Sequence, residues 1–333
     1  MARVHLRCTG QSTPNPREED LIPARLLVAS AAADPRRRHH LVDDPAAADI
    51  ILFAEAHDDD ASCGPFLGKI LADPVYRRFP GKCFVHSGQD RPVPLLPGIY
   101  PSVERRWAWA GWARSGCYLV SPNPYLAAGL KAAAPEKRHL ASFLGTCGRV
   151  PVRHRLLLLK TEPDLVIRDT GPGFIAAIRS GDDDALAALK SGFVQTSLAS
   201  RFLICPRGVG AGSIRLFEAM ELGVAPVIVS DAWTPPAGPP WPEFSIRVPE
   251  RDLPRLPAIL RDRAPDAAAM GAAARRAWEA HYAPTTLFDT VAEDCAALAR
   301  ERQVPAPLAR AAARAHLLRP VHARRLIRRL RGR

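Results

Sequence analysis

The stretch RFLICPRGVGAGSIRLFEAMELGVAPVIVSD, residues 201–231, predicts a strand, a glycine-rich loop, a helix and a second strand in succession. The apolar runs 202–205 and 224–229 are typical of buried parallel strands. Ser213 is expected at the N-cap of the helix, with its hydroxyl accepting a hydrogen bond from a backbone N–H group of the first turn. Gly223 suits a left-handed helix end. The stretch therefore predicts one βαβ unit.

The loop of this unit has features that suit an anion. It offers backbone N–H groups, the positive end of a helix dipole and the cation of Arg207, followed by Gly208. Arg215 and Glu218 are three residues apart, so they share one face of the helix. A carboxylate there can accept hydrogen bonds from both hydroxyls of a ribose. On spacing alone, an ordinary βαβ unit with a surface Arg–Glu pair is an equally good interpretation.

Length and cysteine usage indicate a soluble protein with more than one domain. The chain has 333 residues, which exceeds the usual size of a single hydrophobic core. Its seven cysteines are dispersed and form no CxxC pair, which favours a reducing compartment. No run of residues resembles a signal peptide or a membrane-spanning helix. We therefore expect a cytoplasmic protein.

The positive charge is concentrated at the C-terminal end. The net charge is +12, and residues 306–333 contain nine arginines and no acidic residue. Because the rest of the chain is nearly balanced, the basic pI does not by itself indicate a specific nucleic-acid partner. Leu308, Ala312 and Leu317 lie near one face of a helix with arginines around them. Such a helix could lie peripherally on an anionic membrane, at the inner face; a basic terminus without defined structure is the alternative.

The N-terminal part of the chain has the pattern of a parallel α/β sheet. Short apolar runs at 26–29, 50–53, 83–85 and 118–120 are expected strands, and a helix is expected at 64–76. Strands that alternate with helices indicate parallel pairing.

Polar residues that follow these strands are candidates for a general base. Glu55 and His57 follow the second run, and His86 and Asp90 follow the third. Groups beyond the ends of parallel strands line the usual ligand crevice, and a carboxylate or imidazole there can remove a proton. Most polar residues in such loops are instead solvated or cap a helix.

Two acidic runs raise the question of a metal site. They lie at 58–60 and 182–184. The second run comes directly before an alanine-rich helical pattern, so N-capping explains it better than metal ligation. We expect no metal.

A second series of strands and helices begins near residue 139. It starts with a strand through Phe143 and a turn at Gly145, where a phosphate could approach closely. Arg149, Arg153 and Arg155 follow and could supply charge. Further strands are expected at 165–167 and 244–248, and helices at 185–194, 253–261, 265–282 and 285–302. The Pro- and Trp-rich loop 232–241 could close over a sugar or nucleotide.

With these pieces in order, residues 139–260 resemble the C-terminal half of the exostosin-family glycosyltransferases. The matching pieces are Leu140 to Gly145, Phe202, Pro206-Arg207-Gly208, Ser213 to Ala219, Pro226-Val227-Ile228, Ser230-Asp231, Trp233, Pro236 and Val248-Pro249-Glu250.

The resemblance implies a GT-B architecture, in which two Rossmann-like domains with parallel sheets face each other. Residues 1–138 would form the acceptor domain, residues 139–303 the nucleotide-sugar-binding domain and residues 304–333 an arginine-rich helical tail. It also implies an inverting, metal-independent transfer of a hexosyl or glycuronosyl group. The donor would be a nucleotide-sugar, usually a UDP-sugar, and the acceptor a hydroxyl of a glycan or lipid-linked molecule.

The resemblance also implies roles for individual residues. Arg207, with Gly208, would hold the diphosphate, assisted by Ser213 and its backbone neighbours. Glu218 would bind the ribose, supported by Arg215, and Gly145 would lie at the entry into the same site. The general base that deprotonates the acceptor hydroxyl would be a residue of the N-terminal domain, with Glu55, His57 and Asp90 as candidates. The alternative is a non-catalytic α/β binding protein that contacts nucleic acid or an anionic membrane through its tail.

Overall fold

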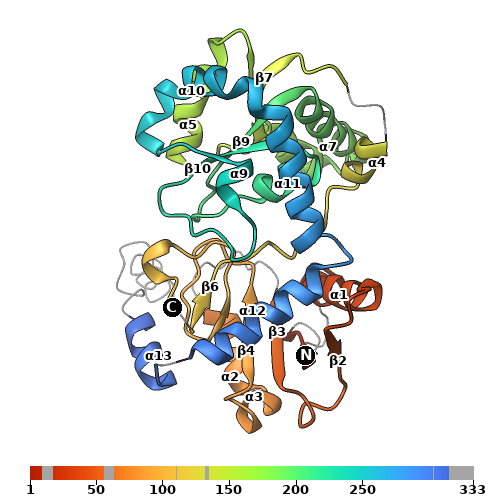
Figure 1. Ribbon diagram of the computed structural model, residues 1–333, viewed down its shortest axis with the longest axis vertical. Coiled ribbons are helices and arrows are strands. Elements are labelled where there is room, and N and C mark those ends of the chain that lie inside the picture. The colour runs from red at the N-terminus through yellow and green to blue at the C-terminus, as the bar shows by residue number, and fades with distance from the viewer. Residues whose placement is uncertain (10–17, 56–63, 110, 132–134, 303, 315–333) are drawn as a thin grey trace. The chain divides into compact units, whose positions relative to one another are not determined.

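The computed structural model of the chain describes residues 1–9, 18–55, 64–109, 111–131, 135–302 and 304–314 (Figure 1). It divides into two compact units. Unit 1 comprises Met1–Val120, Ala232–Gly238 and His281–Arg333, and unit 2 comprises Ser121–Asp231 and Pro239–Ala280.

Unit 1 is built on a parallel sheet with the strand order β2-β1-β3-β4-β5-β6. The strands are β1 (Ala2–Arg7), β2 (His39–Leu41), β3 (Ile50–Glu55), β4 (Cys83–Ser87), β5 (Gly98–Ile99) and β6 (Ala113–Arg114). Its helices are α1 (Glu18–Ala33), α2 (Gly64–Ala72), α3 (Pro74–Arg78), α12 (Leu287–Glu301) and α13 (Ala306–Arg314), with a 3-10 turn at Arg105–Trp107.

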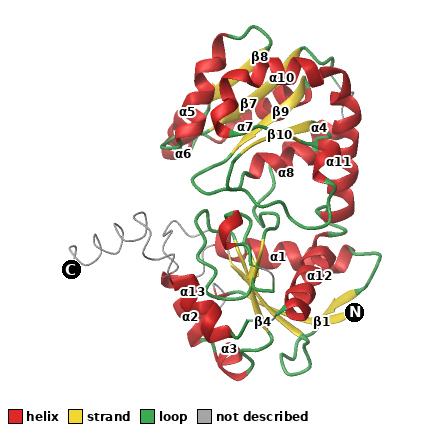
Figure 2. Cartoon of the chain, turned by 60° about the vertical axis from the view of Figure 1, so that its left-hand side comes forward, coloured by secondary structure: helices red, strands yellow, loops and turns green. Residues whose placement is uncertain are grey.

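Both faces of this sheet are covered by helices. Side chains two residues apart on a strand share a face, and Phe53 and Val85 pack with Ile70 of α2, Tyr76 of α3 and Ala309 of α13. On the other face α1 and α12 pack against each other and against the strands, as Figures 1 and 2 both show. Helices on both faces of a parallel sheet are the arrangement of a Rossmann-like domain.

Three expectations for unit 1 are wrong in detail. Residues 26–29 lie in α1 and not in a strand, because the apolar run continues into the alanines up to Ala33 and is long enough for a helix. The first strand of unit 1 is instead β1 at Ala2–Arg7, which the sequence analysis did not predict. Residues 118–120 pair with no described strand, and β6 at Ala113–Arg114 is the edge of the sheet.

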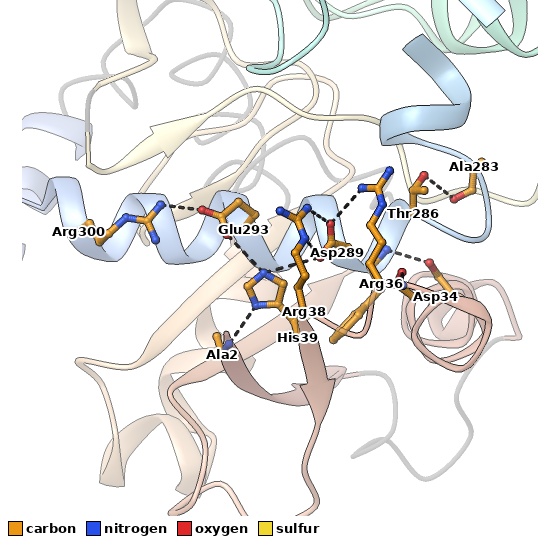
Figure 3. Close-up of polar contacts among 12 residues, drawn as sticks. Ala2, Asp34, Arg36, Arg38, His39, Ala283, Thr286, Asp289, Glu293 and Arg300 are labelled. Carbon is orange, nitrogen blue, oxygen red and sulfur yellow. Dashed lines mark hydrogen bonds and ion pairs between the residues drawn. The ribbon is translucent and has the colours of Figure 1, made fainter. Parts of the chain in front are cut away.

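The predicted domain 139–303 also differs from the structure, because α12 packs on unit 1. Figure 3 shows the contact. The carboxylate of Asp289 is fully buried and accepts hydrogen bonds from Arg36 (Nη1, 3.3 Å) and Arg38 (Nε, 3.1 Å). Nε2 of His39 lies 3.3 Å from Glu293, while its Nδ1 accepts from the amide of Ala2 at 3.1 Å. These ionic contacts join α12 to the loop before β2.

The other domain boundary differs by fewer residues. Residues 121–138, expected in the first domain, fall in unit 2. Their helix α4 (Tyr125–Lys131) packs on α7 (Asp183–Leu198), and the side-chain amide of Asn123 donates to the carbonyl of Lys190 at 3.1 Å. The predicted boundary followed the first clear strand at 139, and the helix before it gave only a weak signal.

The buried Asp289 carboxylate gives a stability prediction. Asp289→Asn should lower the free energy of unfolding of unit 1 by about 2 kcal/mol, since it weakens charge-assisted hydrogen bonds to two arginines. Urea denaturation followed by circular dichroism measures this change. The matched control is Asp43→Asn, an exposed carboxylate of the same unit, which should change stability by no more than about 0.5 kcal/mol. Equal effects of the two substitutions would contradict the role given to Asp289.

Unit 2 is built on a second parallel sheet, with the strand order β11-β10-β9-β7-β8. The strands are β7 (His139–Gly145), β8 (Leu165–Asp169), β9 (Ser200–Pro206), β10 (Ala225–Val229) and β11 (Ile246–Arg247). Besides α4 and α7, the helices are α5 (Pro151–Leu157), α6 (Gly171–Ser180), α8 (Ile214–Glu221), α9 (Trp241–Phe244), α10 (Leu256–Arg263) and α11 (Ala267–His281). Short 3-10 segments lie at Leu158–Thr161, Glu250–Arg255 and Ala264–Asp266.

The core of unit 2 lies between the sheet and helices α5, α10 and α11. Phe143, Phe202 and Ile204 point from the strands into a cluster with Leu156 of α5 and Leu260 of α10. Helices α7 and α8 contact β7, β9 and β10 as well. This unit therefore has the same Rossmann-like construction as unit 1, which confirms the predicted GT-B fold class of two parallel-sheet α/β domains.

Most elements of unit 2 agree with the sequence prediction. The strands at 139–143, 165–167, 202–205 and 224–229 are confirmed as β7, β8, β9 and β10, and the left-handed end of α8 lies at Gly223 (φ 65°). The run 244–248 is divided between the end of α9 and the short β11, and the helix expected at 253–261 begins as a 3-10 segment before α10. Helices at 265–282 and 285–302 are confirmed as α11 and α12.

The basic tail is helical as far as the structure describes it. Ala309 and Ala313 of α13 are buried against unit 1, whereas Leu308 is 63% exposed. The face that packs on unit 1 is therefore one residue away from the apolar face around Leu308 and Ala312, whose binding to a membrane stays a prediction. Residues 315–333, with the other arginines, lie outside the described residues. Within the described ranges, no helix combines the length and apolar character needed to cross a membrane.

Candidate functional site

The loops at the carboxyl ends of the strands of unit 2 bring together the residues singled out in the sequence. Gly145 ends β7, Arg207 follows β9 directly, and Asp231 follows β10 by two residues. Glu250 follows β11 and starts a 3-10 segment. Because the strands are parallel, all these ends lie at one edge of the sheet.

The glycine-rich loop 208–212 is closed by its own hydrogen bonds. The amide of Gly208 donates to the carbonyl of Gly212 at 3.0 Å. The hydroxyl of Ser230, at the end of β10, donates to the carbonyl of Ala211 at 2.9 Å. The loop is thus fixed to the neighbouring strand, directly before α8.

Arg207 lies where the sequence predicts a cation, and its partner is Glu250. Its Nε lies 2.7 Å from Oε1 and its Nη2 3.4 Å from Oε2 of that carboxylate. Arg155 approaches the same carboxylate at 3.5 Å. The amide of Glu250 donates to Asp231 at 3.0 Å, which fixes the start of its segment. The site therefore holds two guanidinium groups around one carboxylate.

Arg215 and Glu218 form an ion pair on one face of α8, as predicted. The guanidinium of Arg215 also donates from Nε to the carbonyl of Leu144 at 3.2 Å and lies 4.2 Å from the ring centre of Phe193. The carboxyl group of Glu218 is 12% exposed. Arg215 thus fixes the Glu218 carboxylate beside the end of β7.

Ser213 has the predicted N-cap position, but not the predicted bond. Its backbone is extended (φ −144°, ψ 123°), as at an N-cap, yet its side chain caps no amide of α8. The hydroxyl oxygen is buried and has no hydrogen-bond partner within the described part of the chain. A buried hydroxyl without a partner is costly, so this group can gain a hydrogen bond from a ligand in the loop.

Gly145 is required by its neighbours. A Cβ atom at this position would lie 3.1 Å from the ring of Phe143 and 4.0 Å from Nε of Arg215. A larger residue here would therefore crowd the ring of Phe143, while its contact with Arg215 would be an ordinary one. Its predicted contact with a phosphate remains a prediction.

Of the three arginines after Gly145, Arg153 connects two loops of the site. It donates to the carbonyl of Thr146 at 2.6 Å and to that of Arg207 at 3.0 Å, so it joins the loop after β7 to the loop after β9. Arg149 is exposed, and Arg155 faces Glu250. The sequence analysis gave no role to Glu250, although its place shortly after a strand was a usable signal.

In unit 1, Glu55 is a candidate base with a buried carboxyl group. It ends β3, is 2% exposed, and accepts hydrogen bonds from the amide (3.0 Å) and the hydroxyl (2.7 Å) of Thr9. Burial raises the pKa of Glu55 to about 7. Asp90 is partly exposed after β4. His57 lies outside the described residues.

His86, another candidate, is a core residue. Its ring is completely buried, and Nε2 lies 3.0 Å from the carbonyl of Cys117. Burial lowers the pKa of His86 to about 4. The imidazole is therefore neutral at pH 7 and structural.

The acidic run 182–184 caps a helix, as expected. Asp182 accepts from the amide of Ala185 at 2.8 Å at the start of α7. Among the residues that the structure describes, no His, Cys, Asp and Glu side chains cluster as a metal site would require. The run 58–60 lies outside the described residues.

The tryptophans of the loop 232–241 are buried. Trp233 is 3% exposed, and its backbone forms an isolated antiparallel bridge with Glu104, also in unit 1. Beside this bridge, the amide of Arg105 donates to the carbonyl of Ala232 at 2.8 Å. Trp241 begins α9 in unit 2, with its ring centre 5.2 Å from that of Phe244. Both rings therefore pack within the protein, and the expected closure over a ligand stays a prediction.

Comparison with known proteins relates this site to one family. Residues 119–262 match the model of the Exostosin GT47 domain. A "Probable glucuronosyltransferase" of Oryza sativa subsp. japonica is 44% identical over 61 residues, which are 18% of this chain and 14% of the relative. An "Exostosin-1 homolog" of Caenorhabditis elegans is 38% identical over 63 residues, 18% of this chain and 16% of the relative. The aligned segments thus span about a seventh of the length of these relatives.

Among solved structures, sucrose-phosphate synthase from Thermosynechococcus elongatus is similar with a TM-score of 0.44 and 13% identity, over 90% of this chain and 98% of the other. The resemblance found from the sequence rests on the segment 139–260, and the family model covers this segment. The match, which covers less than half of the chain, thus supports the resemblance of this segment to the Exostosin GT47 domain.

Proposed function

We propose that the chain is a glycosyltransferase that moves a hexosyl or glycuronosyl group from a UDP-sugar to a hydroxyl group of a glycan or lipid-linked acceptor. The observation that carries this proposal is the arrangement in the segment that resembles the Exostosin GT47 domain. Arg207, the unpartnered hydroxyl of Ser213 and the fixed carboxylate of Glu218 surround one glycine-rich loop at the carboxyl edge of a parallel sheet.

The diphosphate of the donor would bind at the glycine-rich loop. The Ser213 hydroxyl and the first amides of α8 would donate to it. Arg207 would turn part of its guanidinium from Glu250 towards the phosphate, and Arg155 would continue to neutralise Glu250. Forked guanidinium groups match phosphate oxygens in geometry and charge.

The ribose of the donor would bind to Glu218. Its carboxylate is held by Arg215, so it can accept from both ribose hydroxyls without a large rearrangement. Preformed hydrogen-bonding groups lose little conformational entropy on binding.

Positive groups at the carboxyl edge of the sheet of unit 2 would assist the breaking of the bond between the sugar and the diphosphate. As the bond between the sugar and the diphosphate breaks, negative charge accumulates on the diphosphate. Fixed cations and N–H groups stabilise this charge without reorganisation, so we propose that the transfer is metal-independent. Glu55 would deprotonate the acceptor hydroxyl, which would then attack the anomeric carbon from the opposite side with inversion.

A donor-hydrolysis panel tests the proposed activity. The full chain is incubated with common UDP-, GDP- and TDP-sugars, and release of the nucleoside diphosphate is measured over time. We expect slow release from one or two UDP-sugars, and a higher melting temperature with the same compounds. If no nucleotide-sugar is hydrolysed and none raises the melting temperature, the proposal is wrong.

A further inference from the structure

A second strongly charged feature of unit 2 lies at the opposite edge of its sheet. It is an open pocket of about 450 Å³ at the amino ends of β7, β8 and β9, beside residues that precede and follow α10. We call it the basic pocket. It is lined by Lys137, Arg138, His139, Leu140, Asp164, Arg201, Arg261, Ala264 and Pro265. Because the strands are parallel, this edge is separate from the loops that follow Gly145 and Arg207.

The floor of the basic pocket is held by backbone bonds between neighbouring strands. The amide of His139 donates to the carbonyl of Ala199 at 3.0 Å, and that of Leu140 donates to the carbonyl of Asp164 at 2.8 Å. The side chains around the opening therefore come from a rigid part of the sheet. A site on rigid elements binds without a large ordering cost.

The carboxylate in the lining is already paired. Asp164 accepts two hydrogen bonds from Arg261, at 2.9 and 3.0 Å, and Arg261 also bonds to Glu162 at 2.8 Å. These bonds from Arg261 hold the pKa of Asp164 below its ordinary value. The carboxylates of Asp164 and Glu162 are thus both bonded to Arg261, and with the three other cations of the lining the surroundings of the pocket keep a net positive charge.

Three cations remain around the opening. Lys137 donates from Nζ to the carbonyls of Leu198 (2.8 Å) and Ser200 (2.9 Å), which fixes its position. Within the described residues neither Lys137, Arg138 nor Arg201 has a carboxylate partner. Desolvation and then the charge of Arg201 lower the pKa of Lys137. Cations that repel each other in this way favour a shared anion.

We propose that the basic pocket is a second ligand site, which binds a diphosphate or triphosphate group. One ammonium and two guanidinium groups around an opening of this size suit several phosphate oxygens at once. The apolar side formed by Leu140, Ala264 and Pro265 leaves room for an uncharged part of the ligand. The free anion and a nucleotide share this chemistry, and the test separates them.

Titration calorimetry with inorganic pyrophosphate tests the proposal. The experiment uses the full-length chain with the substitution Arg207→Gln, which weakens anion binding at the other edge of the sheet. We expect one site for pyrophosphate in this variant. Adding Arg138→Gln and Arg201→Gln should weaken its binding by about tenfold for each lost guanidinium, since each makes charge-assisted hydrogen bonds.

The matched control adds Arg179→Gln and Arg276→Gln instead, which removes the same charge from exposed positions of unit 2. Binding should then change by less than about twofold, because distant exposed charges are screened. A parallel titration with UDP decides the source. A UDP affinity that falls in the pocket variant but not in the control variant identifies a nucleotide as the ligand of the pocket, and a UDP affinity that is equal in the two variants identifies the free anion.

Two results would overturn the proposal. One is equal affinity for pyrophosphate in the pocket variant and in the control variant. The other is the absence of pyrophosphate binding together with binding of polygalacturonate, which would make the pocket a contact for an acidic polysaccharide. Circular dichroism melts of the pocket variant verify that it is folded.

Discussion

Replacing Glu55 with Gln is expected to lower kcat for sugar transfer by about 100-fold to 10,000-fold, the usual contribution of a general base. Gln has nearly the same shape, and its carbonyl oxygen can still accept a hydrogen bond from Thr9. The loss would therefore reflect the missing proton acceptor and not a damaged fold. Initial-rate measurements with a donor found in the hydrolysis panel determine kcat.

The pH profile provides a second test of the same residue. Burial raises the pKa of Glu55 to about 7, so the base is deprotonated and active above that pH. We expect kcat to fall below about pH 7 in the wild type and to lose this dependence in Glu55→Gln. The matched variant Asp90→Asn separates the two candidate bases. If Asp90→Asn loses activity while Glu55→Gln keeps it, Asp90 is the base.

The raised pKa of Glu55 also affects stability. A carboxyl group with a folded pKa near 7 and an ordinary value of 4.5 binds a proton more tightly in the folded state. Its contribution to stability is complete below about pH 4.5 and is lost as the pH rises through 7. Glu55→Gln should therefore remove this part of the pH dependence of urea denaturation.

The second large effect concerns nucleotide binding by Glu218. Glu218→Gln should weaken UDP binding by about tenfold to 100-fold, since hydrogen bonds from the ribose to a charged acceptor are replaced by weaker ones. The same substitution removes the ion pair with Arg215. Wild-type protein should also bind UDP more tightly than 2′-deoxy-UDP, and the variant should distinguish them less. Titration calorimetry measures both affinities.

A control from the same unit makes the Glu218 result specific. Glu243 is an exposed carboxylate of α9, and Glu243→Gln should bind UDP as the wild type does. Equal discrimination between UDP and 2′-deoxy-UDP in wild type and Glu218→Gln would show that Glu218 does not contact the ribose.

Unit 2 could be predicted well because its signals are local. The apolar run before Arg207, the glycines that follow and the helix from Ser213 to Gly223 lie within one short stretch. Each element is specified by its own residues and bounded by a turn or a cap. The ion pair of Arg215 and Glu218 follows from helical spacing alone.

The contacts that complete the site could not be predicted in this way. Arg207 and Glu250 are 43 residues apart, and Thr9 and Glu55 are 46 apart. Both pairs depend on which strands are neighbours in the sheet, and a single sequence does not state the strand order. The packing of α12 on unit 1 was not predicted for the same reason. Its residue Asp289 accepts hydrogen bonds from arginines some 250 residues earlier in the chain.

The proposed function depends most on where a nucleotide binds. Hydrogen–deuterium exchange of the wild-type chain, with and without saturating UDP, measures this directly. We predict slower exchange of backbone amides at 144–153 and 207–218, the loops after β7 and β9 and the start of α8. No change in these two segments, with protection confined to unit 1, would contradict the proposed site.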